Sequence, residues 1–259
     1  MSYVKKSLGQ NFLIDKNIIR KIISLVDFEN KNIIEIGPGK AALTNELLKK
    51  KPKSLLLIEK DYLLAEKLKI KYSSNKTIKV INEDILKLNI ESFFKENSVI
   101  FGNLPYNISS QILIKFLKLK KWPPKYSDMI FMFQKELGER IIGKFKTKNY
   151  GRLSIIVNYR LKILKKILVS PNCFFPKPKV RSMVIHFTTK NRKSIKSIEN
   201  LENITKIMFS NKRKMINKNI KKILNKKDIN EIKDLKLNIR PSEIPPDAYY
   251  KITEFFEKK

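Results

Sequence analysis

Short apolar runs alternate with helical patterns in the first half of the chain. The runs occupy residues 33–36, 55–58, 78–81 and 99–101, and each has the length of a buried strand. Before the first run, isoleucines recur at helical spacing after Asp15, which is a suitable N-cap. Strands that alternate with helices in this way predict an α/β fold with a doubly wound, Rossmann-like sheet, whose ligand lies at the carboxyl ends of the strands.

The pattern changes towards the C-terminus. Residues 109–119 predict a helix, residues 129–133 a further buried strand, and residues 150–154 the start of another β-segment. From about residue 190 there is no glycine and no strand pattern, and apolar residues recur at helical spacing. We therefore predict two domains: residues 1–189 form the Rossmann-like domain with an N-terminal extension, and residues 190–259 form a small, basic, all-helical domain.

A loop with candidate chemistry follows the apolar run 99–101. Its residues are Asn103, Leu104, Pro105 and Tyr106. Pro105 disfavours a helical conformation at Leu104, so the Leu104 carbonyl and the Asn103 side-chain carbonyl can converge on one amino group. Two such acceptors would favour a pyramidal nitrogen whose lone pair faces an electrophile, and Tyr106 would stack on the base that carries the amine. The alternative interpretation is an ordinary turn, because Asn and Pro are common turn residues.

Other strand ends carry residues suited to a nucleoside ligand. Gly37 and Gly39 follow the first run, where glycine lets the backbone approach a ligand closely. Glu59 ends the second run about twenty residues later, the spacing at which a carboxylate accepts hydrogen bonds from ribose hydroxyls. Asp84 follows the third run. The fuller glycine pattern of a dinucleotide site is absent, and these residues together with the 103–106 loop fit S-adenosylmethionine better.

Charge and composition narrow the function. The chain has 259 residues, and no apolar run is long enough to cross a bilayer or to serve as a signal peptide, so we expect a cytoplasmic protein without a membrane partner. The single cysteine, Cys173, and the single histidine, His186, exclude an intramolecular disulfide and most metal and triad chemistries; no metal site is predicted. The formal net charge of +32 favours nucleic acid as the partner, although a codon bias towards lysine explains part of it.

Two groups of basic residues are candidates for RNA contacts. One lies on the expected outer side of the helix at 109–119, where it forms either a solvated face or a basic rim beside the 103–106 loop: Lys115, Lys118, Lys120 and Lys121. The other lies in the basic helical domain, where side chains suited to phosphates gather: Lys212, Arg213 and Lys214.

Taken together, these motifs resemble those of the ribosomal RNA adenine dimethyltransferases, and the resemblance extends over nearly the whole chain. It implies transfer of methyl groups from S-adenosylmethionine to the amino groups of two adjacent adenosines near the 3′ end of small-subunit rRNA. The catalytic loop that it implies is residues 103–106. The cofactor contacts that it implies are Asn11, Leu13, Gly37, Glu59 for the ribose, Asp84 for the adenine, and Asn103.

The segment at residues 174–182 resembles a further family motif, Phe-x-Pro-x-Pro-Lys-Val. Its prolines hold Phe174 outside regular structure, and the resemblance implies that this ring stacks on an extruded adenine opposite Tyr106. Two residues depart from the family pattern: Ala41 stands in place of a glycine, and Arg181 in place of an aspartate.

Two other functions share parts of this pattern. A large-subunit rRNA adenine methyltransferase that confers antibiotic resistance would have the same catalytic loop, and a noncatalytic RNA-binding assembly or transcription factor would keep the fold. The motif at 174–182 and the basic residues 212–214 favour the small subunit. The intact Glu59, Asp84 and 103–106 loop favour an active enzyme. The expected partner is the rRNA of a small-subunit assembly intermediate, bound by a monomer.

Overall fold

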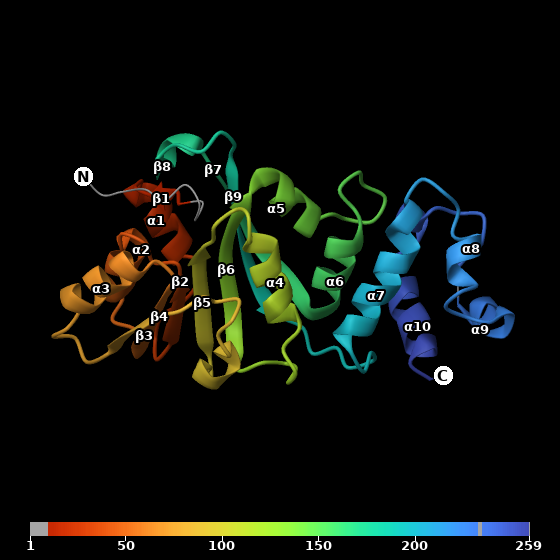
Figure 1. Cartoon of the computed structure of the whole chain (residues 1–259), viewed down its shortest axis with the longest axis horizontal. Helices are drawn as coiled ribbons and strands as arrows, with labels where there is room; N and C mark the ends of the chain where they lie inside the picture. Colours follow the sequence, from red (N-terminus) through yellow and green to blue (C-terminus); the bar gives the residue numbers. More distant parts are fainter. Residues whose placement is uncertain (1–9, 233–234, 259) are drawn as a thin grey trace. The chain divides into compact units, whose positions relative to one another are not determined.

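The computed structural model describes residues 10–232 and 235–258. These residues form two compact units (Figure 1). The first unit contains the chain up to residue 138 and residues 163–189, and the second contains residues 139–162 and the chain from residue 190 onward. Residues 139–162, which the predicted division at residue 189 assigned to the first domain, therefore belong to the second unit.

The first unit is built around a seven-stranded sheet. Its strands are β2 (Asn32–Ile36), β3 (Ser54–Glu59), β4 (Ile78–Asn82), β5 (Ser98–Asn103), β6 (Tyr126–Gln134), β7 (Leu161–Val169), whose first residues fall in the second unit, and β9 (Ser182–Thr189). They lie in the order β4-β3-β2-β5-β6-β9-β7, in which neighbours from β4 to β6 are parallel and β9 is antiparallel to β6. The apolar runs predicted as strands are confirmed, and so is the Rossmann-like fold. The order of strand addition reverses between β2 and β5, which makes that point the topological switch of the sheet.

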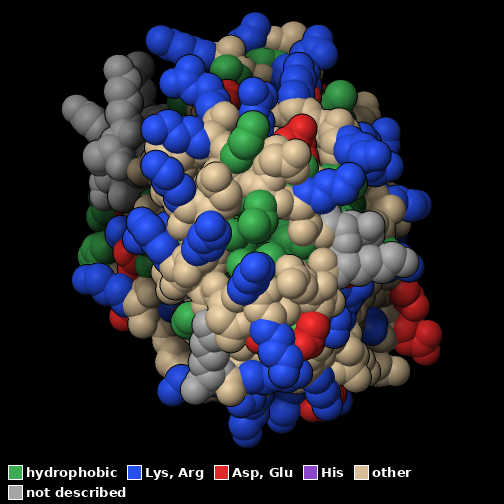
Figure 2. All heavy atoms as spheres, turned by 90° about the vertical axis from the view of Figure 1, so that its right-hand side faces the viewer, with side chains coloured by type: hydrophobic (Ala, Val, Ile, Leu, Met, Phe, Trp, Pro, Cys, Tyr) green, Lys and Arg blue, Asp and Glu red, His purple; other side chains and the backbone are tan. Residues whose placement is uncertain are grey.

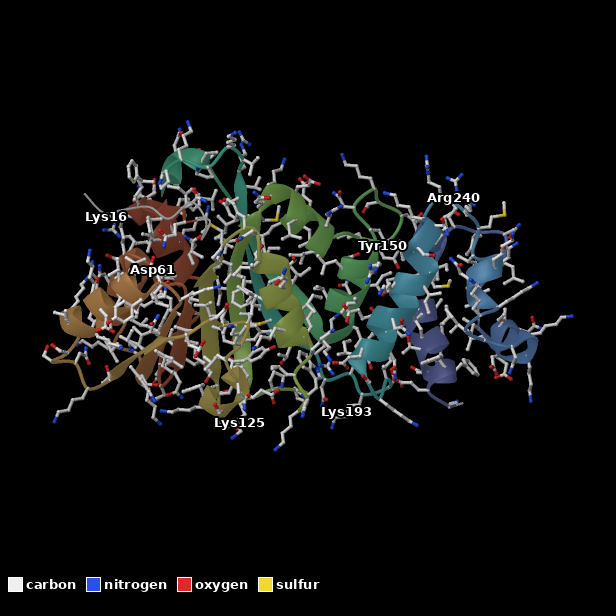
Figure 3. The ribbon with its side chains drawn as sticks, in the orientation of Figure 1. Lys16, Asp61, Lys125, Tyr150, Lys193 and Arg240 are labelled. Carbon is white, nitrogen blue, oxygen red and sulfur yellow. The ribbon has the colours of Figure 1, made fainter. Side chains whose placement is uncertain are left out.

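Helices connect the strands of the first unit. They are α1 (Lys16–Ile23), α2 (Ala42–Lys49), α3 (Tyr62–Lys71), the 3-10 helix η2 (Ile90–Phe93), α4 (Ser109–Leu117) and α5 (Lys135–Ile141), whose last residues fall in the second unit. The predicted N-cap of α1 is confirmed, because the Asp15 carboxylate accepts the Ile18 N–H at 2.9 Å. Asp61, labelled in Figure 3, caps α3 in the same way by accepting the Leu63 N–H at 3.0 Å.

Both faces of the central parallel strands β2, β3 and β5 are buried, whereas the edge strand β4 is partly exposed. On one face, Ile33 and Phe101 belong to a hydrophobic core that includes residues of α1 and α2. On the other face, Phe131 packs edge to face against Phe116 of α4, with ring centroids 5.5 Å apart. Strands that are covered on both sides need apolar residues at every position, which explains why they appear in the sequence as continuous apolar runs rather than alternating ones.

A separate two-stranded ladder joins the N-terminal segment to the segment near residue 174. Strand β1 (Phe12–Leu13) pairs antiparallel with β8 (Phe174–Phe175), which follows the 3-10 turn η3 (Pro171–Cys173). Phe12 lies opposite Phe175, and Leu13 lies opposite Phe174. The expectation that Phe174 stands outside regular structure is therefore wrong.

The second unit is mainly helical in its described residues. Its elements are α6 (Arg152–Arg160), α7 (Ile198–Met208), η4 (Phe209–Asn211), α8 (Asn217–Ile220), α9 (Lys226–Glu231), η5 (Pro241–Glu243) and α10 (Pro246–Phe256). The helical character predicted from residue 190 onward is confirmed. Across the described part of both units, no helix combines the length and apolar character that a membrane crossing requires.

Hydrogen bonds within the second unit tie the segment 139–162 to the C-terminal helices. The Tyr150 hydroxyl donates to the Ile244 carbonyl at 2.8 Å, and the Tyr250 hydroxyl donates to the Ile155 carbonyl at 3.1 Å. The β-segment predicted at 150–154 is wrong, because α6 starts there: Ser154 accepts the Gly151 N–H and begins the helix.

Candidate active site

A pocket of the first unit lies at the carboxyl ends of β2, β3, β4 and β5. Its empty space of about 940 Å³ includes the open solvent at its mouth. The residues that follow each strand end all contribute to its wall: Gly37, Glu59, Asp84 and Asn103. This is the place that a doubly wound sheet provides for a ligand, at the switch point between β2 and β5.

The turn after β2 needs its glycines. Gly37 has φ = 67° and Gly39 has φ = 55°, in the left-handed region that other residues adopt only at a cost. A Cβ on Gly39 would lie 2.8 Å from the Phe12 ring, so glycine is also required for close packing. Ala41 has φ = 65°, which accounts for the glycine that the family has there. Its methyl group is buried in the core and does not line the pocket.

Glu59 places a nearly buried carboxylate at the end of β3. One carboxylate oxygen accepts the Gly39 N–H at 3.0 Å, and the other accepts the Asp61 N–H at 2.9 Å. Burial raises the pKa of Glu59, and these two backbone N–H groups oppose that effect. The carboxylate thus braces the glycine turn while its remaining lone pairs stay available to hydroxyl groups of a ligand.

A second glutamate lies behind this site, in the middle of β2. Glu35 is 2% exposed, and its carboxyl accepts the Thr44 hydroxyl at 2.7 Å. Burial raises the pKa of Glu35 to about 8; the Thr44 hydroxyl opposes this effect and the Glu59 carboxylate adds to it. Glu35 is therefore mainly neutral at pH 7, and Glu59 is not placed beside another buried charge.

Asp84 begins a tight turn after β4. One carboxylate oxygen accepts the Leu86 N–H at 2.9 Å, and the other pairs with the Lys60 ammonium at 2.8 Å. Partial burial acts to raise the pKa of Asp84, but Lys60 and the Leu86 N–H outweigh it, so the pKa is lowered and Asp84 stays ionised at neutral pH.

Lys115 supports the same turn from α4. Its ammonium donates to the Leu86 carbonyl at 2.9 Å and to the Leu88 carbonyl at 2.7 Å. Desolvation lowers the pKa of Lys115, and the nearby Asp84 carboxylate opposes that shift. The outward position predicted for Lys115 is therefore wrong: its side chain folds back on the turn that carries Asp84. For Lys118, Lys120 and Lys121, the two interpretations, a solvated face and a basic rim beside the 103–106 loop, both stay open.

The 103–106 loop begins where β5 ends, and the N-terminal segment fixes its first residue. The Asn103 amide nitrogen donates to the Asn11 carbonyl at 2.9 Å, which turns the amide oxygen the other way. The Leu104 side chain is buried and packs back over Gly102, where a Cβ would lie 2.5 Å from a Leu104 methyl group. Gly102 thus makes room for the loop's fold.

Tyr106 is held by a hydrogen bond across the pocket wall. Its hydroxyl lies 2.6 Å from the Ser182 hydroxyl at the start of β9. Burial raises the pKa of Tyr106, so the phenol stays protonated at neutral pH and offers a flat, uncharged ring. Pro105 and Tyr106 both line the pocket, as predicted for a loop that contacts a ligand.

Two predicted site residues face the core instead. Leu13 is 4% exposed and Phe174 is 3% exposed; they lie opposite each other in the β1–β8 ladder, and neither lines the pocket. The prediction that Phe174 offers its ring opposite Tyr106 is wrong in this structure, because alternate side chains of a strand point to opposite faces and Phe174 occupies the inner one. The pocket is lined by Asn11, as predicted, and by Phe12.

The sequence interpretation missed several lining residues. They are Gln10, Phe12, Ile36, Ile58, Lys60, Leu64, Glu83, Ile85, Asn107, Ile108 and Ile112, whereas Gly39 lines the pocket as its place in the glycine turn predicted. Most of them stand next to a predicted site residue in the sequence, so their position beside a strand end could have predicted that they line the pocket. For Ile112, the only signal was its place on the inner face of a helix, which indicates burial rather than ligand contact.

The second unit carries the predicted basic residues in an exposed turn. Lys212, Arg213 and Lys214 follow η4 and are all exposed. Figure 2, which shows the side of the molecule on which α8 to α10 lie, has many Lys and Arg side chains and few acidic ones. Within the described residues, no cluster of His, Cys, Asp and Glu side chains could hold a metal ion.

Known proteins are similar to this chain over nearly its whole length. The family model described as ribosomal RNA adenine dimethylase matches residues 1–258. The protein of Pelagibacter ubique named ribosomal RNA small subunit methyltransferase A is 44% identical over 255 residues, which cover 98% of this chain and 97% of that protein.

Solved structures show the same similarity in three dimensions. A dimethyladenosine transferase from Plasmodium falciparum has a TM-score of 0.79 and 25% identity, over 95% of this chain and 98% of that one. The 23S rRNA methyltransferase ErmE has a TM-score of 0.69 and 22% identity, over 95% of this chain and 100% of that one, a likeness that concerns the fold alone.

Proposed function

The chain belongs to the ribosomal RNA adenine dimethylase family, and we propose that it transfers methyl groups from S-adenosylmethionine to the exocyclic amino groups of two adjacent adenosines near the 3′ end of small-subunit rRNA. The observation that carries this proposal is one pocket in which carboxylates from the strand ends lie together with the 103–106 loop. Glu59 and Asp84 line one part of the pocket, and the oriented amide of Asn103 lines the other.

The charge of the pocket supports S-adenosylmethionine as the ligand. Three carboxylates line it, from Glu59, Glu83 and Asp84, and the lysine that lines it, Lys60, is already paired with Asp84. Carboxylates repel the phosphate groups of a nucleotide, whereas they attract a positively charged sulfonium. In this assignment Glu59 accepts hydrogen bonds from the ribose, Asp84 contacts the adenine, and the Gly37 backbone passes beneath the ligand. When bound, the cofactor supplies an electrophilic methyl group.

Asn103 orients the amine that accepts the methyl group. Because its amide nitrogen is held by the Asn11 carbonyl, its amide oxygen is fixed as an acceptor. The Leu104 carbonyl is the second acceptor in this proposal. Together they hold the two N–H groups of the adenine amine, so that the nitrogen lone pair faces the methyl group. Rate acceleration then comes mainly from proximity and orientation.

Tyr106 provides a surface for the target base. An adenine inside folded RNA must be extruded before it reaches such a pocket, and stacking on an aromatic ring offsets part of that cost. The hydrogen bond to Ser182 fixes the Tyr106 ring in advance. Because its phenol is protonated at neutral pH, Tyr106 does not act as the base; in this proposal the surplus proton of the methylated amine passes to water.

The proposed substrate is the rRNA of a partly assembled small subunit, in the cytoplasm, bound by a monomer. The pocket holds one base, so selection among many adenosines has to come from RNA shape. Exposed basic residues such as Lys212, Arg213 and Lys214 supply contacts to phosphates without reading the sequence.

The test is incubation of the protein with labelled S-adenosylmethionine and unmethylated small subunits, followed by mapping of the labelled bases. We expect dimethylation of two adjacent adenosines near the 3′ end, with a preference for subunits that lack late-binding proteins over naked rRNA. Label in large-subunit rRNA would indicate the antibiotic-resistance activity instead. Absence of label with retained binding would indicate an RNA-binding factor without catalysis.

A further inference from the structure

The β1–β8 ladder presents an aromatic surface outward. Leu13 and Phe174 point into the core, so their neighbours Phe12 and Phe175 point to the opposite face. Phe175 is 60% exposed, which is unusual for a phenylalanine in a strand. Phe12 lies directly opposite it and also lines the pocket. The two rings therefore extend the pocket wall onto the surface.

A lysine from the glycine turn lies against both rings. The Lys40 ammonium is 4.8 Å from the centroid of the Phe12 ring and 5.9 Å from that of Phe175, within the range of cation–π attraction. Lys40 is exposed. Phe12, Lys40 and Phe175 form what is called here the aromatic platform.

The chain next to the platform is basic. Lys177, Lys179 and Arg181 follow Phe175 and are exposed, and there is no acidic residue between positions 174 and 182. An exposed aromatic ring beside several cations is the combination that binds single-stranded nucleic acid, in which bases stack on rings and phosphates meet cations. Ile14 and Val180 are exposed apolar neighbours in the chain, but Lys is depleted at protein–protein interfaces, so the cations beside Phe175 favour a nucleic acid over a protein partner as the occupant.

We propose that the aromatic platform binds an unpaired nucleotide of the RNA substrate next to the adenosine in the pocket, with its base stacked on Phe175 and its phosphate near Lys40. This inference rests on the proposed function, because the RNA is the substrate of that reaction. Stacking on a ring does not depend on base identity, so the platform holds the strand in place and leaves the pocket to select the base. Phe12 belongs to both surfaces, and the platform begins where the pocket ends.

The experiment compares Phe175→Ala, Phe175→Trp and the unchanged chain, with a single-stranded oligoribonucleotide that contains two adjacent adenosines as the probe. RNA affinity is measured by fluorescence anisotropy over a range of salt concentrations, and S-adenosylmethionine affinity by calorimetry without RNA. Tyr62→Ala is the matched control, because Tyr62 is 62% exposed in the same unit without belonging to the platform.

We expect Phe175→Ala to weaken RNA binding by about 5- to 150-fold, the range for loss of one stacked base. The salt slope should not change because no charge is removed, and cofactor affinity should stay the same. Phe175→Trp should restore RNA affinity and, with Trp122 replaced by Phe, its fluorescence should be quenched by RNA. Tyr62→Ala should have no effect.

Three results would refute this proposal. The first is an unchanged RNA affinity in Phe175→Ala, and the second is an equal loss of RNA affinity in Tyr62→Ala. The third is a loss of S-adenosylmethionine affinity in Phe175→Ala that accounts for the whole loss of RNA affinity. The last result would mean that Phe175 only supports the Phe12 wall of the pocket. A failure of the proposed function would be recognised separately, because the unchanged chain itself would then not methylate small subunits.

Discussion

Glu35 makes the stability of the first unit depend on pH in a defined direction. Its pKa is raised to about 8 by burial, from an ordinary value of 4.5. Between these values the native chain keeps a proton that the unfolded chain has released, so unfolding releases a proton. Stability is then fully present below pH 4.5 and is lost as pH rises towards 8, by about 1.4 kcal/mol for each pH unit. Above pH 8 both states are ionised and the loss levels off.

The variant Glu35→Gln removes this titration and keeps an oxygen that can accept the Thr44 hydroxyl. Apart from Glu59, whose carboxylate interacts with Glu35, the other titrating groups are common to both proteins, so their effects cancel when the two are compared. We expect the free energy of unfolding of the unchanged chain to fall by about 2 kcal/mol relative to Glu35→Gln between pH 6 and pH 8. Urea unfolding followed by circular dichroism at several pH values measures this difference.

The control is Glu66→Gln, which replaces a partly exposed glutamate of α3. Its stability should run parallel to that of the unchanged chain over the same pH range. The same parallel behaviour in Glu35→Gln would refute the reasoning, because it would mean that the buried carboxyl is ionised throughout and that water or a rearrangement stabilises its charge.

Three further predictions concern binding and catalysis. Glu59→Ala should weaken S-adenosylmethionine binding by roughly 1.5–3 kcal/mol, the scale of a charge-assisted hydrogen bond; unchanged affinity by calorimetry in a folded variant would remove Glu59 from the ribose site. Asn103→Ala should lower turnover about a hundredfold or more without loss of RNA affinity, since one preorganised acceptor is lost; a near-normal single-turnover rate would mean that the 103–106 loop is only a structural turn. Replacing Lys212, Arg213 and Lys214 together with Ala should lower RNA affinity and reduce the log–log salt slope by roughly two to three units, measured by filter binding, whereas an unchanged slope would mean that these side chains only contact solvent.

The sheet could be predicted because its central parallel strands β2, β3 and β5 are buried on both faces and therefore appear as apolar runs. The start of α1 could be predicted because the Asp15 carboxylate caps the helix by accepting the N–H of Ile18, three residues later in the chain. The helix at residues 152–160 was missed because its sequence is rich in β-branched and aromatic residues, and its burial among the C-terminal helices overrides that local preference. The place of residues 139–162 depends on such distant contacts, which leave no local signal.

In the candidate site, residues at strand ends were predictable because topology brings those ends together. The orientation of Phe174 was not, because two phenylalanines stand side by side and only the pairing of β8 with β1 decides which one faces the core. The position of Lys115 was not predictable either, since a helical pattern shows the outer side of a helix but not the carbonyl groups that a long side chain can reach.

The β1–β8 ladder has a consequence for the time at which the protein becomes active during its own synthesis. The amide of Asn103 is oriented by the backbone of the N-terminal segment, and that segment is anchored by a strand that is translated roughly 160 residues later. At ordinary rates of translation this interval is roughly 10–30 s. A nascent chain that ends after β6 already contains the 103–106 loop and the pocket carboxylates of Glu59, Glu83 and Asp84, yet the segment that orients the Asn103 amide still lacks its partner strand, although Gln10 can already contact Asp61. If Asn103 acts as proposed, we expect methyl transfer to reach its full rate only after β8 has left the ribosome and paired with β1.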